Sequence, residues 1–368
     1  MSKPKKPTLM SEPDDMHLRR RQQFLYKALY ENVRTLQLES IDVSVAGVER
    51  KQPGTQTYVV AQAFVYHEKF WLWMLDYTAG VDLDTLAPQL AGIVDEFVRW
   101  NDANVPYRKY LKEKYAEEDK QQGITTRLDV SAVDFDNQIW FEDALQLVSV
   151  AILLRDARSV KRIVKAMVFN RYADALYEQL IADFVDDPQE DMQAVLHDAP
   201  YSTLVEAYFE DDDAKAVALV KDYLKNWYKH QDGARWYNAH LKIEDDLSFY
   251  YGYWAFEAGA TCFLLDLDDS TIDHMVYPKD LVAYARKLQA DGRWTTTKDA
   301  PLETEAAAST MLNCPGGEAC PKSGWWFTPA KVGSRRYFEA GETMPVIEGS
   351  DYGATFWQWD TDQTGPNP

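Results

Sequence analysis

The spacing of apolar residues over the first 290 residues is the feature that most restricts the fold of this chain. In RRRQQFLYKALYENVRTLQLESI, Phe24, Leu25, Leu29, Val33 and Leu36 recur at intervals close to one α-helical turn. The same pattern returns, with short connections, in residues 57–80, 84–100, 137–155, 158–182, 203–209, 214–230, 250–265 and 280–289. Short connections join antiparallel neighbours. The sequence therefore predicts a mainly α fold, built as an array of antiparallel helical hairpins.

The composition changes near Asp299, where Gly and Pro become frequent. Short aromatic runs, GWWFT, RRYF and ATFWQW, lie between these residues, a pattern typical of turns and short β strands. We expect their tryptophans to form a core or a docking contact. The predicted parts are a flexible N-terminus (1–14), an N-terminal helical domain (15–125), a C-terminal helical domain (126–298) and a small β-rich C-terminal appendage (299–368).

Negative charge is concentrated in the second half of the helical region. The net charge is −20, yet residues 1–120 are nearly balanced, and Asp183 to Ala214 carries eleven carboxylates with no Lys or Arg. Nucleic-acid binding needs a basic surface, so this distribution favours a cationic partner or plain solvation. The candidate partner-binding residues are Asp186, Asp187, Glu190, Asp191, Glu210, Asp211, Asp212, Asp213, Glu244, Asp245, Asp246, Asp268 and Asp269.

The compartment follows from what the sequence lacks. No stretch approaches the roughly 18 apolar residues of a membrane span, and MSKPKKPTLMSEPDDM has no apolar core of a secretory signal. Three cysteines are too few for a disulfide scaffold. We therefore expect a cytoplasmic protein that contacts neither membrane nor nucleic acid.

The sequence lacks the motifs of several common classes of enzyme and metal site. It has no Gly-rich phosphate loop, no G-x-S-x-G and no H-E-x-x-H. Cys314 and Cys320 lack two further ligands for zinc, and the turn at Asp266–Ser270 lacks the Gly and Glu of a calcium loop, with Thr271 and Tyr277 in their places. We expect no metal, no cofactor and no catalytic residue.

Glu257 is the one residue that keeps an enzymatic alternative open. It lies in YYGYWAFEAGATCFLL, a predicted central helix over Tyr250–Leu265. A buried carboxyl must be neutral or paired, and we expect an Arg, Lys or Tyr of a neighbouring helix as its partner, with Lys279 and Arg286 as candidates. The alternative is a helical enzyme that uses Glu257 and nearby carboxylates. The residues predicted to be structural are Trp254, Glu257, Pro278 and Lys279, with Pro278 in the first turn of the next helix.

Two stretches resemble the PoNi immunity proteins. The run Gly252–Glu257, the turn with Asp268 and Asp269, and Tyr277–Leu281 are similar to motifs that recur in this order in that family. The resemblance covers roughly residues 15–290; the tail after Asp299 departs from it.

The resemblance implies an all-helical, non-enzymatic protein that neutralises a cognate toxin delivered to rival bacteria, as in type VI secretion. The expected partner is a PoNe-type DNase with a basic nuclease domain, bound through the acidic surface. Immunity against a non-nuclease effector is the alternative, and the oligomeric state is left open.

Overall fold

The computed structural model describes residues 15–122, 130–293, 313–328, 334–347 and 355–359. Its contacts divide the chain into two compact units, Met1–Lys298 and Asp299–Pro368, each of which is described by itself. The predicted flexible segment 1–14 lies outside the described residues, and a division of the helical part near residue 125 stays a prediction.

The described part of the first unit is helical, which confirms the predicted fold class. Several helices begin where a side chain caps the first free backbone N–H groups: Thr55 accepts from Tyr58, Asn137 from Ile139, and Asp174 from Tyr177. The helices are α1 (Met16–Arg19), α2 (Lys27–Glu49), α3 (Gln56–Thr78), α4 (Leu83–Leu86), α5 (Leu90–Lys114), α6 (Ala116–Gln122), α7 (Gln138–Leu153), α8 (Ala157–Ala166), α9 (Ala175–Ile181), α10 (Asp198–Glu206), α11 (Asp213–Trp227), α12 (Phe256–Leu264) and α13 (Lys279–Ala290).

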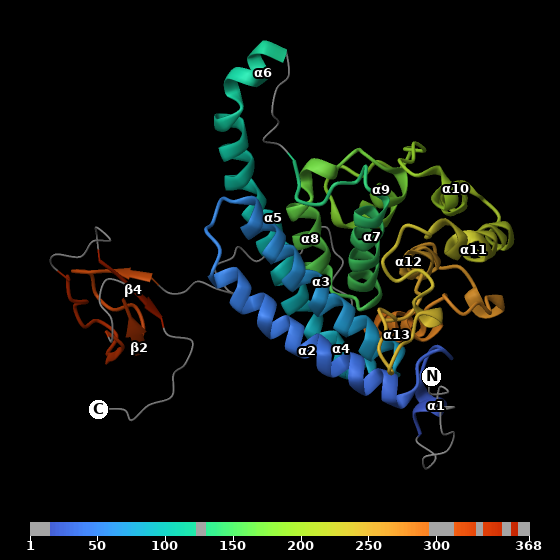
Figure 1. The fold of residues 1–368 in the computed structure, drawn as a ribbon, viewed down its shortest axis with the longest axis horizontal. Coiled ribbons are helices and arrows are strands. Elements are labelled where there is room, and N and C mark those ends of the chain that lie inside the picture. Colours follow the sequence, from blue (N-terminus) through green and yellow to red (C-terminus); the bar gives the residue numbers. More distant parts are fainter. Residues whose placement is uncertain (1–14, 123–129, 294–312, 329–333, 348–354, 360–368) are drawn as a thin grey trace, which may run out of the picture. The chain divides into compact units, whose positions relative to one another are not determined.

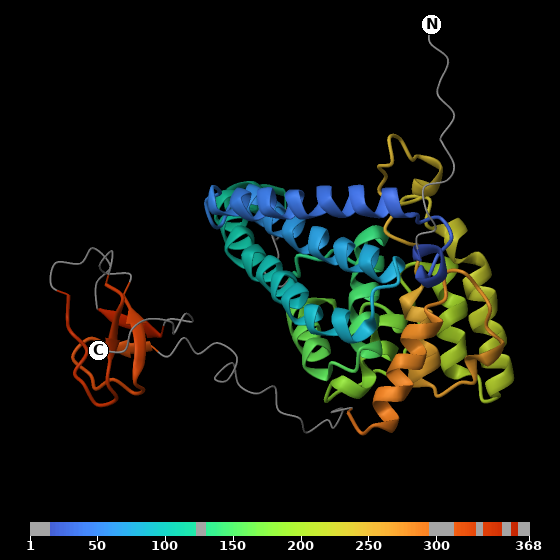
Figure 2. The ribbon, with the colours of Figure 1, turned by 90° about the horizontal axis from the view of Figure 1, so that it is seen from below.

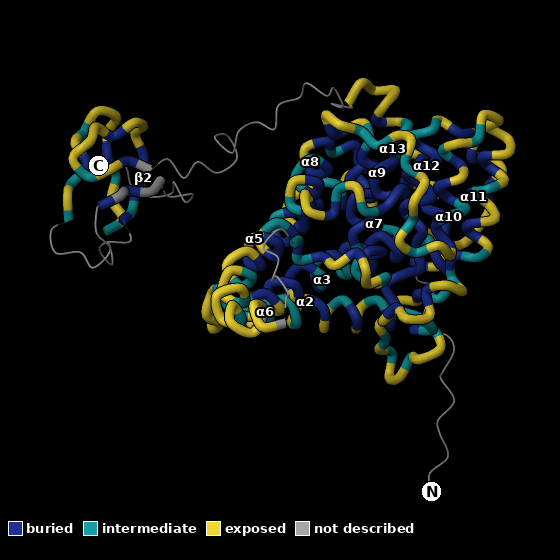
Figure 3. The backbone as a smooth tube through the Cα atoms, turned by 90° about the horizontal axis from the view of Figure 1, so that it is seen from above, coloured by how far each residue is buried: buried dark blue, intermediate teal, exposed yellow. Residues whose placement is uncertain are grey.

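The helices pack pairwise around one continuous core. α2 packs on α3, α3 on α5 and α5 on α8, while α7 packs on α12 and α10 on α11 (Figures 1 and 2). Buried residues fill the interior of the unit, as Figure 3 shows, and Trp73, Trp100 and Trp227 are among the largest of them. Within the described residues, none of the helices combines the length and the apolar character needed to cross a lipid bilayer.

The stretch before Glu257 differs from the prediction. Helix α12 begins only at Phe256, and Tyr250–Ala255 runs as non-helical chain, with the N–H of Ala255 donating to the carbonyl of Val276 at 2.9 Å. Gly252 has a φ of +110°, and a Cβ there would lie 2.1 Å from Oγ1 of Thr78. The prediction was wrong because a buried extended segment and a buried helix are both apolar on every side, so periodicity cannot separate them.

The second unit holds a four-stranded antiparallel sheet. Its strands are β1 (Asn313–Pro315), β2 (Gly324–Phe327), β3 (Arg336–Phe338) and β4 (Phe356–Trp359), in the order β1-β4-β2-β3. The three aromatic runs form β2, β3 and β4, which confirms a small β-rich appendage. Trp326, Phe338 and Trp357 are buried together, so two of the tryptophans form the core of this unit.

Candidate functional site

The acidic stretch predicted to bind a partner lies on the loop after α9, on α10 and at the start of α11. In the loop, Asp186, Glu190 and Asp191 are exposed. Buried Asp174 fixes this loop, because its two carboxylate oxygens accept from the N–H of Tyr177 at 3.0 Å and of Leu196 at 2.9 Å. The loop therefore presents its carboxylates from a defined backbone.

Asp187 has a structural contact of its own. Nη1 of Arg171 lies 3.1 Å from its carboxylate, and Nε of the same guanidinium lies 3.0 Å from Oε1 of Glu178, which is completely buried. The hydroxyl of Tyr172 also donates to Asp187, and this bond, followed by Arg171, lowers the pKa of Asp187. Of the four loop carboxylates, Asp187 is thus the one already engaged within the chain.

The four acids from Glu210 to Asp213 lie at the start of α11. Asp212 is the N-cap residue, and its side chain accepts from the N–H of Lys215 at 3.1 Å. Glu210 accepts from the N–H of Asp212 at 3.0 Å and lies 3.7 Å from Nζ of Lys215. Asp211 and Asp213 are exposed. Two of these four carboxylates therefore have a local structural role.

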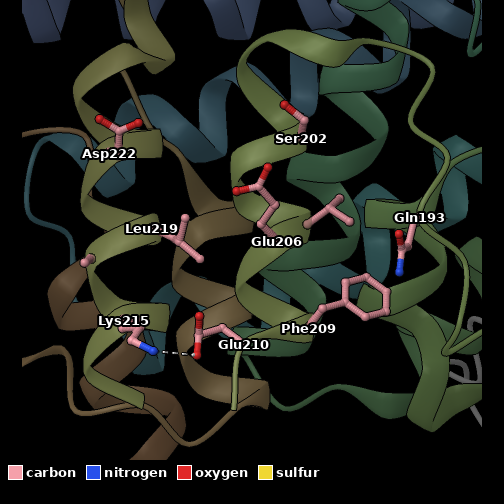
Figure 4. Close-up of a pocket in the computed structure, with 10 residues that line it drawn as sticks. Gln193, Ser202, Glu206, Phe209, Glu210, Lys215, Leu219 and Asp222 are labelled. Carbon is pink, nitrogen blue, oxygen red and sulfur yellow. Dashed lines mark ion pairs between the residues drawn. The ribbon is translucent and has the colours of Figure 1, made fainter. Parts of the chain in front are cut away.

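A groove of about 770 Å³ runs between α10 and α11. Figure 4 shows Glu206 and Leu219 facing each other across it, with Asp222 beyond them on α11 and the Lys215–Glu210 pair at the other end. Phe209 projects toward Gln193 of the acidic loop (Figure 4) and is 39% exposed. We call the carboxylates and apolar side chains that line this hollow the α10–α11 groove; its lining residues are Gln193, Ser202, Val205, Glu206, Phe209, Glu210, Lys215, Ala218, Leu219 and Asp222.

Sequence reasoning missed three important members of this groove. Glu206 and Asp222 are exposed carboxylates, but neither has an acidic neighbour in the sequence, whereas the prediction favoured runs of adjacent acids. Leu219 lies one turn after Lys215 and three residues before Asp222, so helical spacing does place all three on one side of α11. That α10 lies opposite this side depends on tertiary packing, which no local sequence pattern shows.

The structure does not bring the Glu244–Asp246 group into the α10–α11 groove. Glu244 and Asp245 line another hollow, whose other walls are α2 and the segment around Leu247 and Phe249. Asp246 accepts from the hydroxyl of Tyr26 at 2.6 Å. These acids therefore border α2, and they form a separate surface from the groove.

The last acidic pair splits between surface and interior. Asp268 is exposed and accepts from the N–H of Ser270 at 3.0 Å; hydrogen bonding by the Ser270 side chain, followed by this backbone bond, lowers the pKa of Asp268. Asp269 is 5% exposed, receives the hydroxyl of Tyr277 at 2.7 Å and forms an ion pair with Arg286. Asp269 is therefore not part of the candidate surface, because its carboxylate is paired with Arg286 inside the fold.

Glu257 is sealed in the core, as predicted, but its partner is Tyr223 of α11. The tyrosine hydroxyl donates to Oε1 of Glu257 at 2.6 Å. Burial raises the pKa of Glu257 to about 7, although the hydrogen bond from Tyr223 acts to lower it. The two suggested partners are engaged elsewhere, since Arg286 pairs with Asp269, and Lys279 is exposed and contacts the carbonyl of Ser270 at 3.4 Å.

The residues around Glu257 hold the fold together. The indole N–H of Trp254 donates to Oγ1 of Thr78 at 2.9 Å, and the side chain of buried Gln22 bonds Tyr250 and the backbone of Tyr253. Pro278 is the N-cap residue of α13, one position before the expected first turn. These hydrogen bonds join the segment before α12 to Thr78 of α3 and to Gln22.

The side chains that could hold a metal ion lie apart from one another in the described segments. Across them, His, Cys, Asp and Glu form no cluster suited to a metal ion, and the three cysteines are free thiols. Glu257 and its buried neighbour Glu142 line none of the hollows described here.

Comparison with known proteins agrees with this picture. One similar solved structure is that of protein PA2201 from Pseudomonas aeruginosa, with a TM-score of 0.56 and 18% identity over 73% of this chain and 92% of that chain; at this identity the likeness shows the fold alone. No curated protein sequence matches the chain. A family model described as "PoNe immunity proteins (PoNi), C-terminal" matches residues 172–281, a range that contains the α10–α11 groove. The match supports the similarity of this chain to the PoNe immunity proteins over residues 172–281.

Proposed function

We propose that this chain is an immunity protein that binds a cognate PoNe-type DNase and neutralises it through the α10–α11 groove. The observation that carries the proposal is the coincidence of three features in one place. The groove lies inside the family match, three of its lining side chains are carboxylates, and the stretch from Asp183 to Ala214 has no Lys or Arg.

Charge complementarity explains why such a surface suits a nuclease. A DNA-cleaving domain must carry a basic face that contacts phosphates. An acidic partner that occupies this face associates quickly, in a manner that depends on salt, and excludes DNA from it. Asp186, Glu190 and Asp191 on the fixed loop extend the same charge beside Gln193, which lines the groove.

The apolar part of the groove supplies what charge alone lacks. Protein interfaces combine an apolar centre with a polar rim, and a few well-packed contacts at the centre carry most of the affinity. In the groove, Leu219 and the exposed ring of Phe209 lie among Glu206, Glu210 and Asp222. We infer that an apolar side chain of the toxin contacts Leu219 and Phe209 while basic side chains meet the carboxylates.

The proposed function is binding and not catalysis. Glu257, the carboxyl that the enzymatic alternative requires, is 1% exposed and lies behind Tyr223. A general acid needs access to a substrate atom. We further propose that the protein acts in the cytoplasm of the cell that makes the toxin, where a DNase delivered by a neighbouring sibling through type VI secretion would meet chromosomal DNA.

The experiment is a plasmid-cleavage assay with the purified cognate toxin and increasing amounts of the chain. We expect cleavage to stop near equal molar amounts. If the toxin is not a nuclease, co-purification from the native strain will identify a different effector and leave the immunity function standing. The proposal is refuted if the toxin does not bind this chain and still cleaves the plasmid at its full rate when the chain is in excess.

A further inference from the structure

A third hollow of the helical unit has the walls of a small-ligand pocket. It has a volume of about 280 Å³ and shares no lining residue with the α10–α11 groove. Four indoles, those of Trp71, Trp100, Trp140 and Trp236, contribute to its walls. Ligand pockets are mostly apolar and measure roughly 300–1,000 Å³, so this hollow suits a molecule of one or two rings.

The entrance of the hollow is apolar and accessible. Val60 and Phe64, one turn apart on α3, are 46% and 43% exposed, and Ile139 in the first turn of α7 is 39% exposed. All three line the hollow. A cluster of exposed apolar side chains around a concave site is typical of a binding surface, so a ligand can reach the indoles without an opening of the fold.

The polar wall, formed by His67 and Asp143, carries no net charge. Nδ1 of His67 lies 2.6 Å from the carbonyl oxygen of Ala63 and must donate to it, because a carbonyl only accepts. Nε2 lies 3.0 Å from Oδ2 of Asp143. A proton must lie between these two atoms for the bond to form, and the pair is neutral as a whole whichever atom holds it.

Arg235 is the positively charged residue that lines this hollow. Its guanidinium lies 5.2 Å from the ring centre of Trp71 and 6.0 Å from that of Phe249. Glu244 and Asp245 line a neighbouring hollow that Arg235 also borders, but among the ion pairs of the described residues none involves Arg235. The aromatic hollow therefore has an accessible cation at its edge.

We propose that this hollow binds a small aromatic carboxylate, with the ring among the indoles and the carboxylate on Arg235. A flat apolar body gains from contact with the tryptophan faces. Guanidinium binds carboxylate through two parallel hydrogen bonds. Both halves of the ligand class thus follow from the side chains that line one hollow, and the site is independent of toxin binding.

The test is isothermal titration calorimetry of the full chain with naphthaleneacetate and with its neutral analogue naphthaleneacetamide. We expect the acid to bind roughly tenfold more tightly than the amide, as a charge-assisted hydrogen bond allows. Arg235→Gln should weaken the acid to the level of the amide. Lys242→Gln, which removes a cation from the neighbouring hollow, is the matched control and should bind the acid like wild type.

Two variants that fill the hollow test its location. Ala63→Phe and Ala132→Phe each place a ring among the indoles, and either one, if it keeps the wild-type circular dichroism spectrum, should abolish binding of both compounds. The proposal is overturned if wild type binds neither compound at millimolar concentration. It is also overturned if Arg235→Gln binds the acid as wild type does, or if a folded hollow-filling variant still binds it.

Discussion

Glu257 is a carboxyl group whose protonation is coupled to folding. Its pKa rises from 4.5 to about 7 because it is buried. Between these values the folded chain holds a proton that the unfolded chain has released, so the free energy of unfolding falls as pH rises through this range. The loss is on the order of 3 kcal/mol. Burial also raises the pKa of Glu142, which acts in the same direction.

We predict that Glu257→Gln removes the part of this pH dependence that Glu257 supplies and keeps the part from Glu142. The amide keeps the shape of the side chain and an oxygen that can accept from Tyr223, yet it never ionises. Urea unfolding at about pH 5 and about pH 8 should show wild type losing stability at the higher pH and the variant losing less. Equal slopes for both proteins would show that Glu257 does not titrate in this range.

Glu257→Ala is predicted to destabilise the fold at every pH. It leaves a cavity in the core and removes the acceptor of the buried Tyr223 hydroxyl, a combination that costs about 2–5 kcal/mol. Thermal unfolding measures the effect. An alanine variant that melts like wild type but no longer protects against toxin would make Glu257 a functional residue instead of a structural one.

For Glu257, residue-scale prediction succeeded for burial and for a Tyr of a neighbouring helix as the kind of partner, but the two named candidates, Lys279 and Arg286, were wrong. A lone carboxyl in an apolar run had to be buried and satisfied, and it is. Its partner Tyr223 lies 34 positions away in sequence, on a helix whose crossing with α12 depends on the whole core. The prediction that Asp269 lies on the binding surface was wrong, because an acidic run such as DLDDS does not show which of its residues is buried against Arg286.

At the scale of one element, neighbouring acids at the start of α11 have different expected roles, Asp212 in capping the helix and Asp211 in binding. Asp212 caps the helix, whereas Asp211 beside it is exposed. We predict that Asp212→Ala lowers the free energy of unfolding by about 1 kcal/mol and that Asp211→Ala leaves it nearly unchanged. Urea unfolding of the two variants compares them directly, and equal losses would contradict the capping assignment. Reversing the charge of all four acids would mix both effects, so the cap should stay intact in binding tests.

Elements were predictable where their periodicity was clear. The presence of long helices in the first 120 residues and of the strands made of aromatic runs follows from local pattern, although α2 and α5 continue to Glu49 and Lys114, beyond the predicted ranges. The segment Tyr250–Ala255 does not, since its non-helical course depends on Gly252 passing Thr78 of α3 and on a bond to Val276. Contacts of this kind join distant parts of the chain, and no window of sequence contains them.

At the scale of the whole molecule, the two units have separate hydrophobic clusters. The cluster around Trp326 and Trp357 shares no residue with the cluster of the helical unit. We therefore predict that residues 1–298 alone keep the helical circular dichroism spectrum and a melting temperature close to that of the full chain. Loss of the cooperative transition on truncation would contradict this independence.

The negative charge of the candidate site and its place in the sequence were predictable, but the shape of the groove was not. Charge counting located the acidic stretch, and the resemblance located the family, but the groove exists only because α10 packs on α11. Glu206, Asp211 and Asp222 are exposed, and none forms an ion pair among those found in the described residues. They are therefore the carboxylates whose replacement tests binding with the least effect on folding.

The most direct test of the account is titration of the purified toxin against two matched triple variants at low and at moderate salt. One, the groove variant, replaces Glu206 and Asp222 of the groove, and Asp211 next to its lining residue Glu210, with Lys. The other replaces Glu39, Asp42 and Glu49, which are exposed on α2, and changes the net charge equally. We predict that the groove variant binds at least about tenfold more weakly at low salt, with a smaller salt dependence, while the α2 variant binds like wild type. Equal affinities for both variants and wild type, or equal weakening by both, would contradict a toxin-binding site at the α10–α11 groove.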